Sequence, residues 1–247
     1  VVSTAGTFDG YHGSESAHKV DFKSLTDVTT WSRVTDNHGA MSSFANQSSV
    51  ILGPPAWSLF VPTQNRVYYD CHAASRPFGP KWFDLKTNTY VQGTGKARSN
   101  NSDETDCGAM IDVLSRGMLL FLDPYQGKLR IEYMDVTANQ PSWVCNSVKL
   151  SVDLKLSPGW NAACWCEDNQ RIIVGGVAGD TTAVYEIEIP KDLNSVWTVT
   201  RAPFGEGQTI TWPINWGYKT WSYNPLTKTI PVVSIDFEGV SDTVKQY

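Results

Sequence analysis

A short polar turn that contains one basic residue precedes an apolar segment four times along this chain. The four basic residues are Arg66, Arg116, Arg171 and Lys228, which are 50, 55 and 57 residues apart. Self-similarity at a nearly fixed spacing is typical of repeat architectures and constrains the fold more than any single motif. The sequence therefore predicts one structural unit of about fifty residues that is used several times.

The clearest copy of this unit runs from Arg171 to Trp197. An apolar run at 172–174 stops at the pair Gly175-Gly176, and an alternating apolar run at 184–189 follows a polar loop. Runs this short, broken by glycine and proline, favour strands, and a glycine pair inside a helix would cost about 2 kcal/mol relative to alanine. We expect an antiparallel sheet unit here.

Two further sequence markers recur at about the same spacing. An acidic residue follows an apolar one, and an aromatic residue comes six to eleven positions later. The acidic residues are Asp21, Asp84, Asp135 and Glu186, and the aromatic ones are Trp31, Tyr90, Trp143 and Trp197. A further short strand is expected before each basic turn, at 57–61, 109–114, 162–166 and 219–223.

Four strands in about fifty residues match one blade of a β-propeller. The expected fold is all-β, a single domain over 1–247, with about five four-stranded antiparallel blades and six as the alternative. The blades are placed at 1–37 (partial), 55–98, 105–152, 159–204 and 217–247 (partial). The partial ends fit a shared closing blade, but equally a ring cut from a longer chain.

The unit resembles a kelch repeat, in which a glycine pair, a later tyrosine and a tryptophan keep the order of Gly175, Gly176, Tyr185 and Trp197. The segment 82–90 is similar to the turn between the third and fourth strands of the same repeat. The first fifty residues also resemble kelch-like repeats of tailed-phage virion proteins. The resemblance implies a propeller, and a virion or extracellular location.

Composition removes several classes of partner. The net charge is −5 with no block of basic residues, so nucleic acid is not expected as a partner. No apolar run approaches eighteen residues, which predicts a soluble chain without membrane insertion. The five cysteines are an odd number, and Cys164 and Cys166 are interpreted as structural thiols on one strand face rather than as a metal pair.

Candidate binding residues lie in the predicted loops at the rim of the propeller, where a rigid scaffold commonly carries function. The loops are expected at 9–19, 70–81, 123–128, 176–182 and 236–242, with inter-blade segments at 93–108, 151–159 and 203–217. The candidates are Tyr11, His12, His18, His72, Arg76, Trp160, Trp212 and Trp216. Solvated histidines are favoured over a metal site, and blade packing over stacking for the tryptophans.

No motif for catalysis is present. The sequence contains no Gly-x-Ser-x-Gly elbow and no His-Glu-x-x-His, and the segment 93–96 lacks the spacing of a phosphate-binding loop. The favoured function is a non-catalytic module that docks onto other protein chains, in a phage virion or tail part for architecture or host attachment, with no cofactor and no metal. A lectin-like module that binds cell-surface glycan is the first alternative, and a kelch-type oxidase or glycosidase the second.

Overall fold

The protein is described by a computed structural model that defines residues 2–9, 12–19, 32–35, 53–72, 79–87, 89–99, 108–156, 162–209, 218–235 and 243–246. Within these ranges the chain is all-β: its regular structure is β-strand apart from two 3-10 turns, Pro62–Gln64 and Leu114–Arg116. The strands form five sheets in which sequence neighbours pair antiparallel. The chain divides into two compact units, residues 1–100 with 140–142, and residues 101–139 with 143–247.

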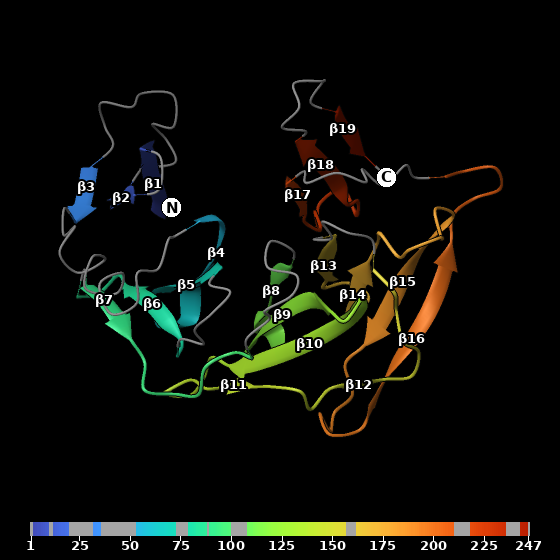
Figure 1. Ribbon diagram of the computed structural model, residues 1–247, viewed down its shortest axis with the longest axis horizontal. Coiled ribbons are helices and arrows are strands. Elements are labelled where there is room, and N and C mark those ends of the chain that lie inside the picture. The colour runs from blue at the N-terminus through green and yellow to red at the C-terminus, as the bar shows by residue number, and fades with distance from the viewer. Residues whose placement is uncertain are drawn as a thin grey trace. The chain divides into compact units, whose positions relative to one another are not determined.

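The first unit contains two sheets (Figure 1). One has three strands, β1 (Val2–Asp9), β2 (His12–Lys19) and β3 (Ser32–Thr35). The other has four strands in sequence order, β4 (Gly53–Val61), β5 (Arg66–His72), β6 (Lys81–Asp84) and β7 (Thr89–Gln92). These four strands lie within the predicted blade at 55–98, apart from the first residues of β4.

The loop predicted at 9–19 is wrong, because residues 12–19 form a strand that pairs with β1 over eight positions. The sequence of β2, HGSESAHK, has no apolar alternation and therefore gave no strand signal. A β-ladder is built from backbone hydrogen bonds, which a polar segment supplies as well as an apolar one. The loop predicted at 70–81 is likewise shorter, since β5 continues to His72.

The second unit begins with a four-stranded sheet of β8 (Ala109–Val113), β9 (Met118–Tyr125), β10 (Lys128–Asp135) and β11 (Trp143–Val144). The loop predicted at 123–128 shrinks to the two residues Gln126 and Gly127, which have φ of 53° and 71°. Two positive φ values in a two-residue hairpin loop match the twist of the flanking strands, so the strands continue to the turn itself.

A five-stranded sheet follows, with β13 (Ala163–Cys166), β14 (Arg171–Val174), β15 (Ala183–Glu188) and β16 (Val196–Pro203) in sequence order. The short strand β12 (Lys149–Leu150) is added in parallel to the outer edge of β16. The last sheet has three strands, β17 (Tyr218–Trp221), β18 (Pro231–Ile235) and β19 (Thr243–Gln246).

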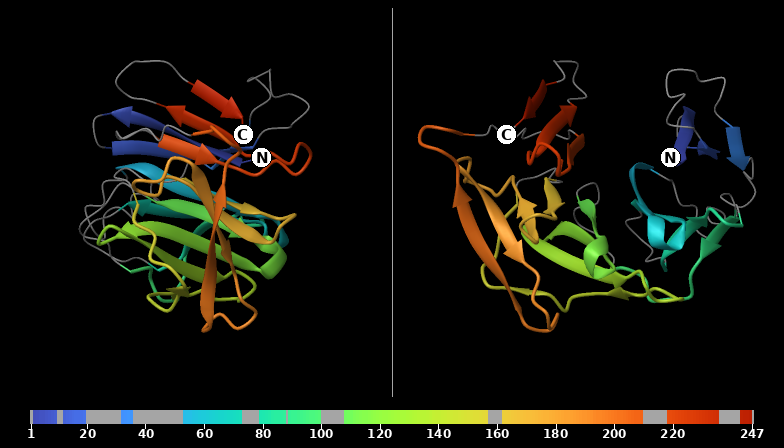
Figure 2. Two further views of the ribbon diagram at one scale, coloured as in Figure 1. Left: turned by 90° about the vertical axis from the view of Figure 1, so that its right-hand side faces the viewer. Right: turned by 180° about the vertical axis from the view of Figure 1, so that it is seen from behind.

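Within the second unit the first strands of successive sheets lie side by side, β13 next to β8 on one side and next to β17 on the other (Figure 2). A hydrophobic core joins the facing sheets. It includes Ile111, Leu120 and Ile131 of the first sheet and Ile172 and Trp197 of the next. Trp197, the aromatic marker of this repeat, is fully buried in this core.

The structure corrects the sequence marker for the repeat. The equivalent feature of the four turns is a residue with left-handed φ, namely Asn65, Gly117, Gln170 and Lys228, at spacings of 52, 53 and 58 residues. Arg116 precedes this residue, so it is not equivalent to the basic residues that follow it in two other turns. A turn geometry recurs here, and the basic residue is only a frequent companion of it.

The acidic marker also needs correction in the sheet of β13 to β16. Arg66 faces Asp84 across β5 and β6, with 3.8 Å between Nε and Oδ2. The same register pairs Arg171 with Glu188, at 3.2 Å, so Glu188 and not Glu186 is the equivalent position. Glu186 lies two residues earlier on the same face of β15 and has no counterpart role in the repeat.

Candidate functional site

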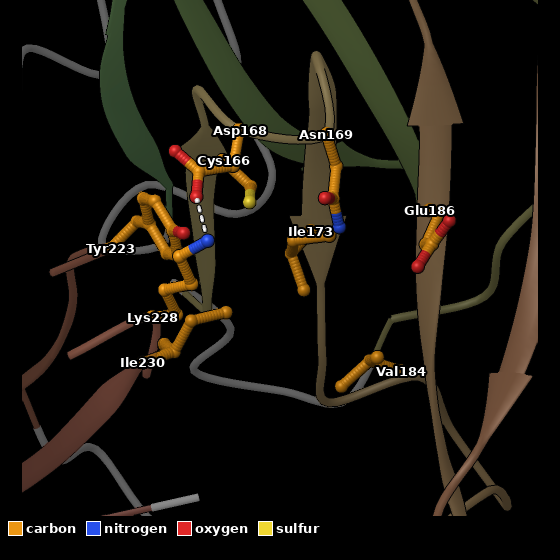
Figure 3. Close-up of a pocket in the computed structure, with 9 residues that line it drawn as sticks. All are labelled: Cys166, Asp168, Asn169, Ile173, Val184, Glu186, Tyr223, Lys228 and Ile230. Carbon is orange, nitrogen blue, oxygen red and sulfur yellow. Dashed lines mark ion pairs between the residues drawn. The ribbon is translucent and has the colours of Figure 1, made fainter. Parts of the chain in front are cut away.

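A groove of about 710 Å³ opens in the second unit, between the sheet of β12 to β16 and the sheet of β17 to β19 (Figure 3). Its size is within the range of sites that hold a small molecule or a few side chains. Residues from β13, β14, β15 and the chain between β17 and β18 line it. They are Cys166, Asp168, Asn169, Ile173, Val184, Glu186, Tyr223, Lys228 and Ile230.

One wall of the groove carries an ion pair between Lys228 and Asp168, with 3.5 Å between Nζ and Oδ2 (Figure 3). Lys228 is the left-handed residue of its turn, and this conformation places it beside the turn that follows β13. Because both side chains are partly exposed, at 75% and 36%, the pair contributes little to stability. Its effect is on charge, because the Lys228 ammonium neutralises the Asp168 carboxylate on this wall.

Tyr223 lies on the same wall. Burial, together with a hydrogen bond from its hydroxyl to Asp168, raises the pKa of Tyr223 to about 12. The phenol is therefore protonated at neutral pH and donates a hydrogen bond rather than accepting a proton.

The floor of the groove is apolar and its far wall is acidic. Ile173 is buried, and Val184 and Ile230 are half-buried beside it. Glu186, on β15, lines the opposite wall and is half-buried. It forms no ion pair with any residue in the described ranges, whereas its neighbour Glu188 pairs with Arg171. The groove therefore combines an apolar floor with one carboxylate that has no ion-pair partner in the described part of the chain.

Among the described residues that line the groove, the groups for nucleophilic catalysis are few. A nucleophile needs an adjacent general base whose pKa is near neutrality. Cys166 is the nucleophile type present, but Tyr223 keeps its proton to about pH 12 and no histidine is among the described residues that line the groove. Likewise, no three His, Cys, Asp or Glu side chains in the described part of the chain are grouped to hold a metal ion.

The loop predicted at 176–182 does lie between two strands, and a polar network ties it to β15 and β16. Arg201 on β16 makes a bidentate contact with Asp180, at 2.6 and 3.0 Å. Asp180 also accepts hydrogen bonds from Thr182 and from the hydroxyl of Tyr185. The Arg201 guanidinium holds the pKa of Asp180 well below its usual value of 3.8, so the carboxylate is already satisfied by the protein.

The hairpin of β9 and β10 carries a second ionic contact, which is buried. Arg130 makes two hydrogen bonds to Asp123, at 3.0 and 2.7 Å, and its guanidinium stacks 4.5 Å above the ring centre of Tyr125. Asp123 is 1% exposed, so this pair is part of the packing of the sheet and is not accessible to a ligand.

Three of the eight predicted binding residues lie in the described part of the chain. His12 and His18 belong to β2 and His72 ends β5, so these three lie in strands rather than in loops. Tyr11, Arg76, Trp160, Trp212 and Trp216 lie outside the described residues, as does the predicted loop at 236–242. A glycan site built from these tryptophans therefore stays a prediction.

Most of the groove was missed from sequence, although one signal was available. Val184, Glu186 and Glu188 alternate on one face of an interior strand. Two acidic residues on such a face indicate that part of the face is not covered by another sheet.

Two further predictions concerned structural thiols at Cys164 and Cys166 and a chain without membrane insertion. Cys164 and Cys166 are buried free thiols on β13, and burial raises the pKa of Cys164 to about 12. No helix in the described residues is long and apolar enough to cross a membrane.

Comparison with known proteins establishes no family for this chain. No protein-family model and no curated protein matches the sequence. The structure is similar to TolB from Acinetobacter baumannii, with 15% identity, a TM-score of 0.49 and coverage of 94% of this chain and 46% of the other. It is also similar to a protein from Lactobacillus plantarum, with 11% identity, a TM-score of 0.39 and coverage of 77% and 50%. The chain thus spans about half the length of each, and TM-scores below 0.5 establish neither fold nor function.

Proposed function

We propose that this chain is a non-catalytic binding module, with a β-propeller fold of about five blades, that docks onto other protein chains of an assembly. The fold proposal is supported by the left-handed turn that recurs at similar spacing and by the side-by-side first strands β8, β13 and β17. Sheets whose first strands adjoin one another are what a radial arrangement of blades requires.

The observation that carries the docking function is the outer edge of β16. The short strand β12 pairs only with Val196 and Trp197. Ser151 then satisfies the next two backbone groups of β16 that point away from β15. Its N–H donates a hydrogen bond to the Trp197 carbonyl, and its hydroxyl accepts one from the Val199 N–H. No strand in the described ranges pairs with this edge of β16 beyond that point.

An open strand edge of this kind accepts an extended segment of another chain by strand addition. Backbone groups alternate along a strand, so the outward groups beyond Ser151 are the Val199 carbonyl and the N–H and carbonyl of Arg201. Pro203 ends the edge, since it lacks an N–H. The free edge thus fits a short segment that continues the line of β12.

The assembly in this proposal is a phage virion or tail part, with a role in architecture or host attachment. That narrower assignment rests on the resemblance of the first fifty residues to kelch-like repeats of virion proteins. A virion or other extracellular location belongs to the same proposal.

The test compares two variants at Arg201 in the assembly isolated from its natural source. Arg201→Pro removes the outward N–H together with the ion pair to Asp180, and Arg201→Ala removes the ion pair alone. We expect only the proline variant to lose incorporation, measured by quantitative mass spectrometry of purified particles. A native chain that is free and monomeric in its source would refute the docking function, and equal incorporation of both variants would refute the role of the edge.

A further inference from the structure

We infer that the groove between the sheet of β12 to β16 and the sheet of β17 to β19 binds the side chain of an arginine or lysine that a partner chain presents. This inference rests on the proposed docking function and names the chemistry of one contact. It concerns a different surface from the edge of β16, so the two can be tested separately.

The charge of the groove selects a cationic group. Lys228 compensates Asp168, and Arg171 compensates Glu188 just outside the groove, at 3.5 and 3.2 Å. Glu186 has no such partner among the described residues. The described lining, with Asp168, Glu186 and Lys228 as its charged residues, therefore has one excess negative charge, and the half-buried Glu186 that carries it is less screened than a surface carboxylate.

The shape of the groove selects an amphipathic cation. Ile173, Val184 and Ile230 provide an apolar surface between the two polar walls. A long aliphatic stem that ends in a charged group matches this order, because the stem packs on the apolar floor while the head reaches a carboxylate. A guanidinium can in addition donate two hydrogen bonds to Glu186, which a simple metal cation cannot do.

The burial of the sheet face also fits an external occupant. On this face Cys166 of β13 is buried, Glu186 of β15 is half-buried and Glu188 is exposed. The burial of side chains on this face of the sheet thus decreases from β13 toward β15. An apolar side chain placed over Glu186 would leave a carboxylate without solvent or partner, which is costly. A basic side chain removes that cost.

The test uses Nα-acetyl-arginine amide as the probe and its citrulline analogue as the neutral control, titrated into the full chain and followed by NMR chemical shifts. We expect arginine to shift the backbone signals of Ile173, Val184 and Glu186, and citrulline to shift none of them. Glu186→Gln should weaken binding about tenfold, the effect of losing one charge-assisted contact. Glu206→Gln is the control for the loss of one acidic charge, because Glu206 is exposed, lies outside the groove lining and forms no ion pair among the described residues, and it should change affinity less than twofold.

A second variant fixes the sign of the charge effect. Lys228→Met frees Asp168 from its ion pair and should tighten the binding of the arginine probe. Tighter binding of inorganic phosphate than of arginine, with loss of that binding in Lys228→Met, would show an anion site and overturn the inference. Equal effects of Glu186→Gln and Glu206→Gln would overturn it too. If arginine does not bind but the chain is still found in its assembly, the groove proposal fails while the docking function stands.

Discussion

The packing of a glycine-rich segment in the first unit gives a sharp prediction about stability. A Cβ added to Gly95 would lie 1.8 Å from the carbonyl oxygen of Pro141 and 2.6 Å from Oγ of Ser142. Neither distance is possible for a real Cβ, and the first involves backbone, which cannot rotate away. Gly95→Ala must therefore push the segment at 93–96 and the segment at 140–142 apart by more than an ångström.

That separation has a calculable cost. The Lys96 N–H donates to Ser142 Oγ at 3.0 Å, and the N–H and hydroxyl of Thr94 donate to Gln140 Oε1 at 3.4 Å. Hydrogen bonds lengthened by an ångström are lost, at roughly 0.5–1.5 kcal/mol each, and overpacking adds about 1–3 kcal/mol. Because these bonds are exposed, we expect a total loss of about 2–4 kcal/mol in the free energy of unfolding.

The assay is urea unfolding followed by tryptophan fluorescence, with hydrogen exchange of the peptides that cover 93–99 and 138–144 as a local readout. Gly205→Ala is the control, since its Cβ would meet only the side chain of Gln208, at 3.4 Å, and its φ is not positive. Alanine there should change stability by less than about 0.5 kcal/mol. Equal stability of the two variants, with unchanged exchange in both segments, would refute the close packing of Gly95 on Pro141.

Three further predictions follow from buried or paired groups. Arg130→Met removes the guanidinium from two buried carboxylates, Asp123 at 2.7 Å and Glu132 at 3.9 Å, and should cost about 3–5 kcal/mol in urea unfolding; a loss below about 1 kcal/mol would contradict this. The pKa of Cys164 is raised from 9.0 to about 12, so the stability that its neutral thiol contributes is present below pH 9 and is lost as the pH rises toward 12. Iodoacetamide at pH 8 should therefore label Cys145 before Cys164, and equal labelling of these two by peptide mass spectrometry would contradict the burial of Cys164. The pKa of Asp180 is lowered, so the stability that its carboxylate contributes is present above pH 3.8 and is lost as the pH falls below that value. Asp180→Asn should therefore flatten the fall in melting temperature between about pH 5 and pH 2. An unchanged slope would contradict the pairing of Asp180 with Arg201.

The strands were the part of the structure that the sequence predicted best, because the patterns that indicate a strand lie within a few neighbouring residues. Glycine at the end of β14, the alternation in β15 and the buried tryptophan of β16 were each readable from sequence. The all-β class follows from them. By contrast β2 was read as a loop, since its polar sequence carries no alternation and only its pairing with β1 makes it a strand.

The groove was not predictable, because its walls come from distant parts of the chain. Asp168 follows β13, whereas Tyr223 and Lys228 lie after β17, and no spacing rule links the two segments. Their proximity depends on β13 and β17 being neighbours, which is a property of the packed sheets. Only Glu186 was informative from sequence alone, because an acidic residue on an interior strand indicates a sheet face that is not fully covered. Its interpretation as a marker of the repeat hid this indication.

The recurring turn explains how one geometry can support both repetition and a local site. A left-handed residue is required in each turn, but Gly117 alone of the four is a glycine, and the others are Asn65, Gln170 and Lys228. Left-handed φ costs about 1 kcal/mol or more for a residue with a Cβ, least for asparagine. Lys228 has this strained backbone conformation and also forms the ion pair with Asp168 on the groove wall. Glycine at this position would relieve the backbone, but it would also remove the positive charge that pairs with Asp168.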